Sequence, residues 1–225
     1  MNPSSNLPSN PSSRAALLIT AFLAALAMPL VASAQAVSVY GGAALVYSPN
    51  YSGPGTDDQL ELQPYIEAEL NGFYGGIWLS FAKQEVYDEV DLYIGYRNQT
   101  ARGLSYDVNY TRYIYPNAGQ DCCGEFGLTL GTAASDNLAL YIDAFYDPEA
   151  SNAAVDIGGE YLVTDNIGIS AEIGSIKNGG AQEWEFGSTY YINDTTSADL
   201  HYYDGSEYKG YVSLSLSFDT TLFGG

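Results

Sequence analysis

Short segments in which apolar and polar residues alternate run along most of the chain. In residues 89–97, for example, Val90, Leu92 and Ile94 share one parity, whereas Asp91 has the other. Because successive side chains of a β-strand point to opposite faces of a sheet, this alternation predicts strands with one apolar and one polar face. The predicted strands, separated by turn residues, are residues 37–47, 59–70, 73–81, 89–97, 104–115, 125–132, 138–146, 153–162, 167–176, 183–192, 196–203 and 208–218.

The connections between the predicted strands are short and long in alternation. Asn71-Gly72 and segment 164–166 are tight turn sequences, whereas segments 48–58 and 116–124 are the longest connections. Short turns at one end, longer loops at the other and an even strand count are typical of bacterial outer-membrane barrels. The sequence therefore predicts an all-β fold, a transmembrane antiparallel up-and-down β-barrel of about 12 strands.

Aromatic residues decide between a membrane barrel and a soluble sheet, because alternation alone fits both. On the apolar parity they lie near both ends of the strands and flank aliphatic residues, which favours a membrane-spanning band. The predicted membrane-interface aromatics are Tyr47, Phe81, Tyr96, Tyr146, Trp184 and Phe218. Pro64 lacks a backbone N–H, so we expect a bulge or a local break of the second strand there.

The beginning of the chain predicts secretion. An apolar run at residues 15–31 is followed by Ala34-Gln35-Ala36, a small-x-small cleavage site. The run is too short for a membrane anchor, and Pro29 interrupts it. We therefore expect residues 1–36 to be a cleaved signal peptide and residues 37–225 to form a single barrel domain located in the bacterial outer membrane.

Acidic residues far outnumber basic ones, with 27 Asp and Glu against 7 Lys and Arg and a net charge of −20. Nucleic acid is excluded as a partner, because binding it requires clustered Lys and Arg. Cys122 and Cys123 are adjacent in a predicted loop and form either a strained disulfide or two free thiols. No acidic spacing resembles a calcium loop, and we predict neither a metal site nor a cofactor.

Three strand motifs rich in tyrosine and glycine lie in the first half of the chain. They read Gly72-Phe73-Tyr74-Gly75-Gly76-Ile77-Trp78, Glu89-Val90-Asp91-Leu92-Tyr93-Ile94-Gly95-Tyr96, and Leu104-Ser105-Tyr106-Asp107-Val108 through Tyr113-Ile114-Tyr115-Pro116. Over roughly residues 60–116 this part resembles the TorF family of Gram-negative porins. The resemblance implies an outer-membrane barrel of the porin type and brings no catalytic residues. The chain departs from the family at residues 47–51 and continues past Phe218 to Gly225.

The polar parity assigns many carboxylates to the interior of the barrel, with Arg97 and Lys209 as the only inward bases. Carboxylates in such excess cannot all form ion pairs, so they favour a hydrated passage that attracts cations. The predicted pore-lining residues are Glu61, Glu67, Glu69, Asp91, Tyr93, Arg97, Asp107, Asp143, Asp156, Glu160, Glu172, Glu185, Asp199 and His201. Many tyrosines share this parity and can fill part of the lumen, so we expect a narrow path.

The function predicted from the sequence is that of an outer-membrane porin, a narrow, cation-preferring passage for small polar solutes. Two alternatives remain open: a non-conducting structural or adhesion barrel that acts through its outer loops, and a channel selective for a sugar or nucleoside stacked on tyrosines. Catalysis is not expected. Ser197 and His201 each lie two residues from Asp199, so the three side chains point to the same face of the strand but stand too far apart to touch. The expected partners are outer-membrane lipid and lipopolysaccharide, the barrel assembly machinery, and small ions or solutes.

Overall fold

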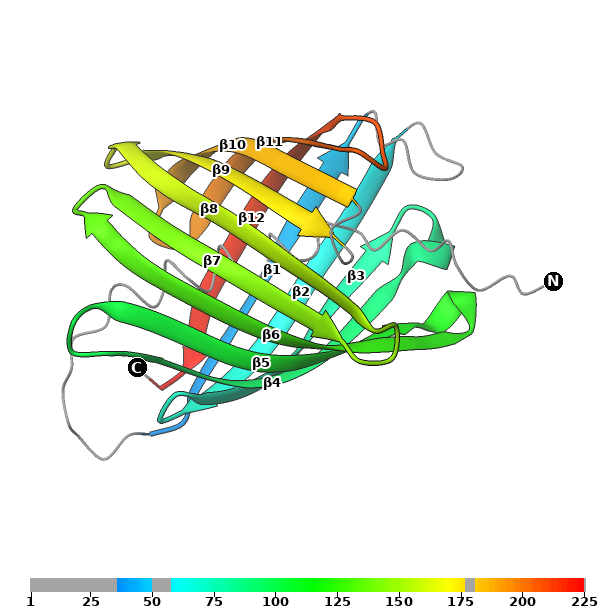
Figure 1. Cartoon of the computed structure of the whole chain (residues 1–225), viewed down its shortest axis with the longest axis horizontal. Coiled ribbons are helices and arrows are strands. Elements are labelled where there is room, and N and C mark those ends of the chain that lie inside the picture. The colour runs from blue at the N-terminus through cyan, green and yellow to red at the C-terminus, as the bar shows by residue number, and fades with distance from the viewer. Residues whose placement is uncertain (1–35, 50–57, 177–180, 225) are drawn as a thin grey trace. The chain divides into compact units, whose positions relative to one another are not determined.

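Twelve antiparallel strands close into one barrel (Figure 1). The structure, a computed structural model, describes residues 36–49, 58–176 and 181–224, so the predicted signal peptide lies outside the described residues. The strands are β1 (Ser38–Ser48), β2 (Gln59–Leu70), β3 (Phe73–Ala82), β4 (Glu89–Gln99), β5 (Leu104–Tyr115), β6 (Gln120–Ser135), β7 (Leu138–Asp147), β8 (Asn152–Thr164), β9 (Ile167–Ile176), β10 (Ala181–Asn193), β11 (Thr196–Gly205) and β12 (Tyr211–Phe223). Each strand pairs with its neighbours in sequence, and β12 pairs with β1 to close the wall. The predicted fold class is confirmed.

The two ends of the barrel differ in their connections. One end, here called the turn end, carries the tight turns, the first residues of β1 and the last residues of β12. At its β2–β3 turn, Asn71 and Gly72 both have positive φ angles, 57° and 84°, as a two-residue hairpin turn requires. The other end, the loop end, carries the longer connections, including the short 3₁₀ helices η1 (Glu85–Tyr87) and η2 (Pro116–Ala118). No helix among the described residues is long and apolar enough to cross a membrane.

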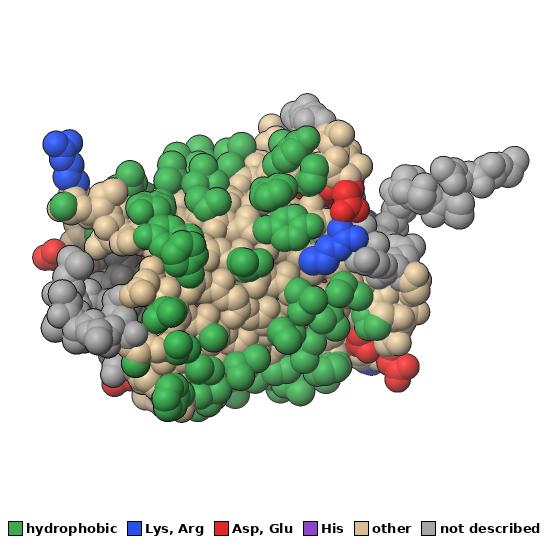
Figure 2. Space-filling view, turned by 90° about the horizontal axis from the view of Figure 1, so that it is seen from below, with side chains coloured by type: hydrophobic (Ala, Val, Ile, Leu, Met, Phe, Trp, Pro, Cys, Tyr) green, Lys and Arg blue, Asp and Glu red, His purple; other side chains and the backbone are tan. Residues whose placement is uncertain are grey.

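Apolar side chains point outward and polar side chains point inward. Along β2, Leu60, Leu62 and Ile66 are exposed, whereas Glu61 and Gln63 between them are buried. Figure 2 shows apolar side chains over the outer wall and charged side chains towards the two ends of the barrel. A single soluble chain rarely exposes so wide an apolar surface. A soluble sheet protein would pack this apolar face in a core. In the described part of the chain the face is exposed instead.

The last strand corrects the sequence prediction, which placed it at residues 208–218. It begins at Tyr211 and ends at Phe223, so Lys209 precedes the strand and lies exposed. The extension has a partner, because Val39 at the start of β1 pairs with Phe223 and Gly42 pairs with Asp219. The residues after Phe218 thus belong to the closing seam of the barrel.

Two further expectations concern single positions. The β2–β3 ladder pairs Leu62 with Phe81 and then Tyr65 with Trp78 in the same register. Pairing with β3 is therefore interrupted next to Pro64 without an extra residue, but β2 itself runs unbroken and Pro64 pairs with Ala43 of β1, so neither the expected bulge nor the expected break of the strand occurs. The segment before residue 125 was wrongly predicted as a loop: β6 begins at Gln120, so both cysteines lie in a strand, and Cys123 is disulfide-bonded.

Candidate pore and its lining

The structure places every predicted pore-lining side chain on the inner face of the barrel. Glu61, Glu67, Asp91, Tyr93, Asp143, Asp156, Glu185 and His201 are buried, and Glu69, Arg97, Asp107, Glu160, Glu172 and Asp199 are half-buried. They occupy alternate positions along their strands, as period-2 side-chain orientation requires. That they line a conducting pore stays a prediction.

Arg97 is the only Lys or Arg on the inner face among the residues that the structure describes. Lys83 and Lys209 are exposed, and Arg102 lies exposed in a turn at the turn end. Arg112 faces outward near the loop end and forms an ion pair with Glu149. The sequence prediction of Lys209 as an inward base was therefore wrong, because this residue precedes β12. The excess of acidic over basic side chains on the inner wall is therefore larger than predicted.

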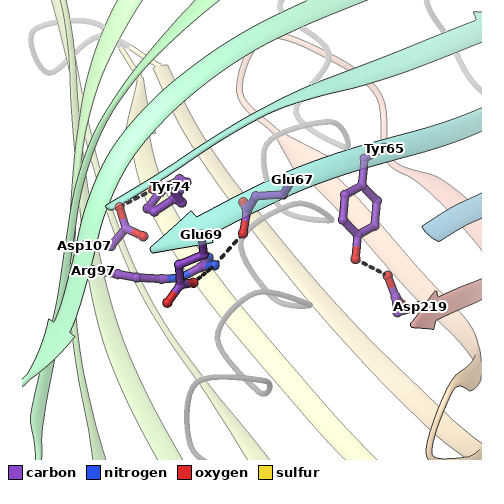
Figure 3. A network of polar contacts seen from close by, with 7 residues as sticks. All are labelled: Tyr65, Glu67, Glu69, Tyr74, Arg97, Asp107 and Asp219. Atoms are coloured by element: carbon purple, nitrogen blue, oxygen red, sulfur yellow. Dashed lines mark hydrogen bonds and ion pairs between the residues drawn. The ribbon is translucent and has the colours of Figure 1, made fainter. Parts of the chain in front are cut away.

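Arg97 is held by two carboxylates and an aromatic ring near the turn end (Figure 3). Its Nη2 atom forms ion pairs with Glu67 and Glu69 on β2, and its Nε atom donates to Glu69 at 2.8 Å. The guanidinium carbon lies 4.4 Å from the centre of the Tyr74 ring, within the range of a cation–π contact. The planar donor fork of arginine can serve two carboxylates at once, which a lysine ammonium cannot do with the same geometry. Arg97 is thus held firmly against the wall.

Most inner carboxylates accept hydrogen bonds from neutral side chains instead of pairing with cations. Thr189 donates to Asp199 at 2.6 Å, and Tyr191 donates to Glu160 at 2.5 Å. Further pairs of this kind include Tyr74 to Asp107, Tyr115 to Glu89, Tyr113 to Glu125, Gln63 to Glu61, Ser80 to Glu61, Thr129 to Asp143 and Tyr65 to Asp219. A hydroxyl stabilises a carboxylate without cancelling its charge. These hydrogen bonds therefore fix the carboxylates in position without supplying a positive charge.

Several inner aromatic rings lie against the wall over glycines. Tyr74 is paired with Gly95, and a Cβ built on this glycine would meet the ring at 2.5 Å. Tyr93 covers Gly76 in the same way, with its hydroxyl at 2.4 Å from such a Cβ. The remaining pairs are Tyr65 with Gly42, Tyr141 with Gly158, and His201 with Gly187. Glycine is the residue that lets a neighbouring ring approach the backbone this closely. These rings run along the wall instead of projecting across the lumen.

The hydroxyls of two serines near His201 are directed at Asp199. Ser197 and Ser215 donate to Asp199, at 3.4 and 3.1 Å, so neither uses its hydroxyl hydrogen towards the imidazole. The Nδ1 atom of His201 lies 3.8 Å from Glu185 Oε1, which is too long for a hydrogen bond. No group of three His, Cys, Asp or Glu side chains that could hold a metal ion occurs in the described part of the chain.

Asp219 is an inner carboxylate that sequence reasoning missed. It accepts a hydrogen bond of 2.8 Å from Tyr65 across the β1–β2 and β1–β12 seams (Figure 3). It was missed because the last strand was expected to end at Phe218. The alternation of polarity in fact continues past Phe218, since Asp219 has the inward parity and Phe218 and Thr220 have the outward one. A predicted strand extended by a few residues would have included Asp219.

The predicted interface aromatics lie on the outer face. Tyr47, Phe81, Tyr146, Trp184 and Phe218 are exposed. Tyr96 is half-buried, because Phe73 and Tyr106 pack on it with ring centres 4.6 and 6.1 Å away. Their position at a membrane interface stays a prediction.

A closed antiparallel barrel with an apolar outside and a polar inside has the architecture of outer-membrane porins. Solved porin structures have a similar fold. The KdgM porin matches with a TM-score of 0.58 at 10% identity, covering 81% of this chain and 98% of that chain, as does KdgM "in complex with disordered oligogalacturonate". The NanC porin matches with a TM-score of 0.55 at 12% identity, covering 84% of this chain and 100% of that chain. At these identities the likeness shows a shared fold.

The family is shown by a sequence model that matches residues 32–205. The chain belongs to the family described as "Bacterial protein of unknown function (Gcw_chp)". No curated protein sequence matches the chain.

Proposed function

We propose that this chain is an outer-membrane porin, a narrow and cation-preferring passage for small polar solutes. The observation that carries the proposal is the closed barrel whose outer face is apolar and whose inner face is acidic. The porin fold of its structural neighbours supports a channel rather than an enzyme. The proposal includes a cleaved signal peptide at residues 1–36, a barrel at residues 37–225 and membership of the TorF porins.

Cation preference follows from the charge of the inner wall. Most of its carboxylates accept hydrogen bonds from neutral groups. Arg97, the only inner Lys or Arg among the described residues, is paired with two carboxylates. Fixed charge of one sign in a confined passage raises the local concentration of counter-ions. An anionic oligosaccharide such as the oligogalacturonate named with KdgM is therefore disfavoured here.

The expected width follows from barrel geometry. Strands spaced about 4.8 Å apart and tilted by about 40° give a twelve-stranded barrel a backbone diameter of about 24 Å. Two facing layers of side chains occupy about 10 Å of this diameter. Tyr74 and Tyr93, which lie along the wall, leave more of the centre free than projecting rings would. The remaining space suits hydrated ions and small solutes.

Planar-bilayer recording of the purified protein tests the proposal. We expect discrete conductance steps, and a reversal potential under a KCl gradient that indicates preference for potassium over chloride. Absence of channel events from protein with a heat-dependent shift in gel mobility, the usual sign of a folded barrel, would exclude the porin function. An anion-biased reversal potential would exclude the cation preference alone.

The second candidate is a barrel that does not conduct and acts through its loops at the cell surface. The dense packing of the inner face favours it, since Asp143, Trp78 and Tyr211 are only 2–3% exposed. Both candidates require insertion into outer-membrane lipid beside lipopolysaccharide by the barrel assembly machinery. The bilayer recording separates them, because folded protein without channel events is the outcome that this second candidate predicts.

A further inference from the structure

Among the buried polar atoms of β9–β11 that make no hydrogen bond within the described structure, three lie around one position. They are Ser170 Oγ, Glu185 Oε1 and His201 Nδ1. The side chains of Glu185 and His201 are 6% and 10% exposed. Burying a polar group without a partner is costly, so native structures rarely leave one unsatisfied. Three such atoms close together indicate a place where a molecule from the lumen supplies the missing partners.

The three side chains surround one glycine. Gly187 on β10 pairs with Ser170 on β9 and with His201 on β11, and Glu185 lies two residues before it on the same face. The His201 ring lies across Gly187, within 2.5 Å of where a Cβ would stand. Ser170, Glu185, Gly187 and His201 thus form one continuous area, here called the Gly187 patch.

The surroundings of the patch favour a positively charged group. Glu172 on β9 pairs directly with Glu185, and Arg97, the only inner Lys or Arg among the described residues, lies on β4 and is paired with Glu67 and Glu69. The carboxylate form of Glu185 can only accept hydrogen bonds, so its open oxygen calls for a donor, and a positively charged donor stabilises that form. The absence of a three-ligand metal group within the described residues favours an ammonium over a metal ion.

An aromatic surface adjoins the patch on the side of β11 and β12. Tyr203 pairs with Glu185 on one side and with Tyr211 on the other. The rings of these two tyrosines are nearly parallel, at 19°, with centres 5.1 Å apart. The ring of His201 lies 5.8 Å from that of Tyr203 at 23°. Aromatic rings pack against the C–H groups of saturated rings.

We propose that the Gly187 patch binds small solutes in which a protonated amine is attached to a compact hydroxylated ring, the chemistry of amino sugars. Glu185 accepts from the ammonium, Ser170 and His201 bond to ring hydroxyls, and Tyr203 packs against the ring. This site rests on the proposed function, because a solute reaches it only through the lumen.

Calorimetric titration of the purified protein with glucosamine and glucose tests the site independently of conduction. The two probes have the same ring and differ in the protonated amine. We expect glucosamine to bind about tenfold more tightly than glucose, as one charge-assisted hydrogen bond allows. Equal binding of the two sugars, or no binding of either because water satisfies the three atoms, would overturn the proposal.

Matched substitutions locate the site. Glu185→Gln keeps the shape of the side chain and is expected to abolish the preference for glucosamine. Glu160→Gln removes the same charge from a carboxylate that is already bonded to Tyr191, and is expected to leave the preference within about twofold. An unchanged preference in Glu185→Gln, with the heat-dependent gel shift intact, would contradict the assignment.

A third variant tests the aromatic surface. Tyr203→Leu is expected to weaken glucosamine binding several-fold while methylammonium, which has no ring, binds as before. Equal loss for both probes would contradict ring packing.

Bilayer recording with the same probes separates failure of the site from failure of the proposed function. If the channel conducts but glucosamine and glucose reduce the current equally, the porin stands and the site is wrong. If no current flows while calorimetry still distinguishes the sugars, the site stands and the porin is wrong.

Discussion

Replacing Arg97 by glutamine is expected to increase the preference of the channel for cations. Arg97 pairs with Glu67 and Glu69, so it offsets part of the negative charge of this level of the lumen. Glutamine removes the positive charge and leaves both carboxylates in place. The local charge then becomes more negative by one unit.

The magnitude follows from the distance between the wall and the axis. With a backbone diameter of about 24 Å and side chains reaching about 6 Å inward, an ion on the axis passes about 6 Å from the lost charge. In water a unit charge at that distance contributes about 0.7 kcal/mol, or about threefold in concentration. The effect is opposite for the two ions, so the ratio of potassium to chloride permeability rises by about three- to tenfold in dilute salt.

Reversal potentials measured under a gradient centred near 0.1 M KCl check this value, because screening at molar salt would hide it. Arg112→Gln is the matched control: it removes the same charge from an ion pair with Glu149 that faces outward, and should leave the ratio nearly unchanged. Adding Glu67→Gln to Arg97→Gln should restore the original value. A ratio that is unchanged in Arg97→Gln, or shifted towards chloride, would refute the assignment of Arg97 to the ion path.

Three further changes test the wall, the outer face and the seam. Gly76→Leu places a side chain where a tyrosine ring now lies, so it should lower single-channel conductance and cost about 1–3 kcal/mol of stability in urea titration. Gly75→Ala faces outward and adds a single Cβ 3.3 Å from the backbone oxygen of Tyr93, so it should leave conductance unchanged and cost less stability. Leu216→Arg puts a charge on the exposed face in mid-strand and should cost about 2–4 kcal/mol in lipid, while Ser215→Arg on the inner face should cost less; equal costs would argue against a lipid-facing surface. Truncation after Phe218 removes the pairs between the end of β12 and the start of β1 and should abolish the heat-dependent gel shift, so a truncated chain that keeps the shift would show that the seam closes without them.

The sequence predicted the barrel well because its signal is local. Residues 59–70, 104–115 and 167–176 were predicted with the bounds that the structure has, since alternation and flanking turns suffice to define a strand. Parity then placed Glu61, Asp91 and Asp143 on the inner face, because side-chain direction follows from position alone.

Features that depend on pairing between distant residues were not predictable in the same way. The alternation continues past Phe218, but the end of β12 depends on how far its pairing with β1 extends, which alternation does not show. The two partners of Arg97 depend on the register between β2 and β4, which lie on either side of β3. The glycine and aromatic pairs likewise join residues on different strands, such as Gly187 and His201.

The order of the strands around the barrel follows the order of the chain, with one exception at the β1–β12 seam. Each hairpin therefore forms backbone pairs only with the preceding and the following strand, although side chains such as Arg97 reach one strand further. Duplicating or deleting a hairpin changes the circumference by two strands and leaves the pairing of the others intact. Gain or loss of a hairpin thus changes the diameter of the barrel in steps of two strands. Such a change alters the size of the solutes that can pass, while the pairing of the remaining strands stays as it is.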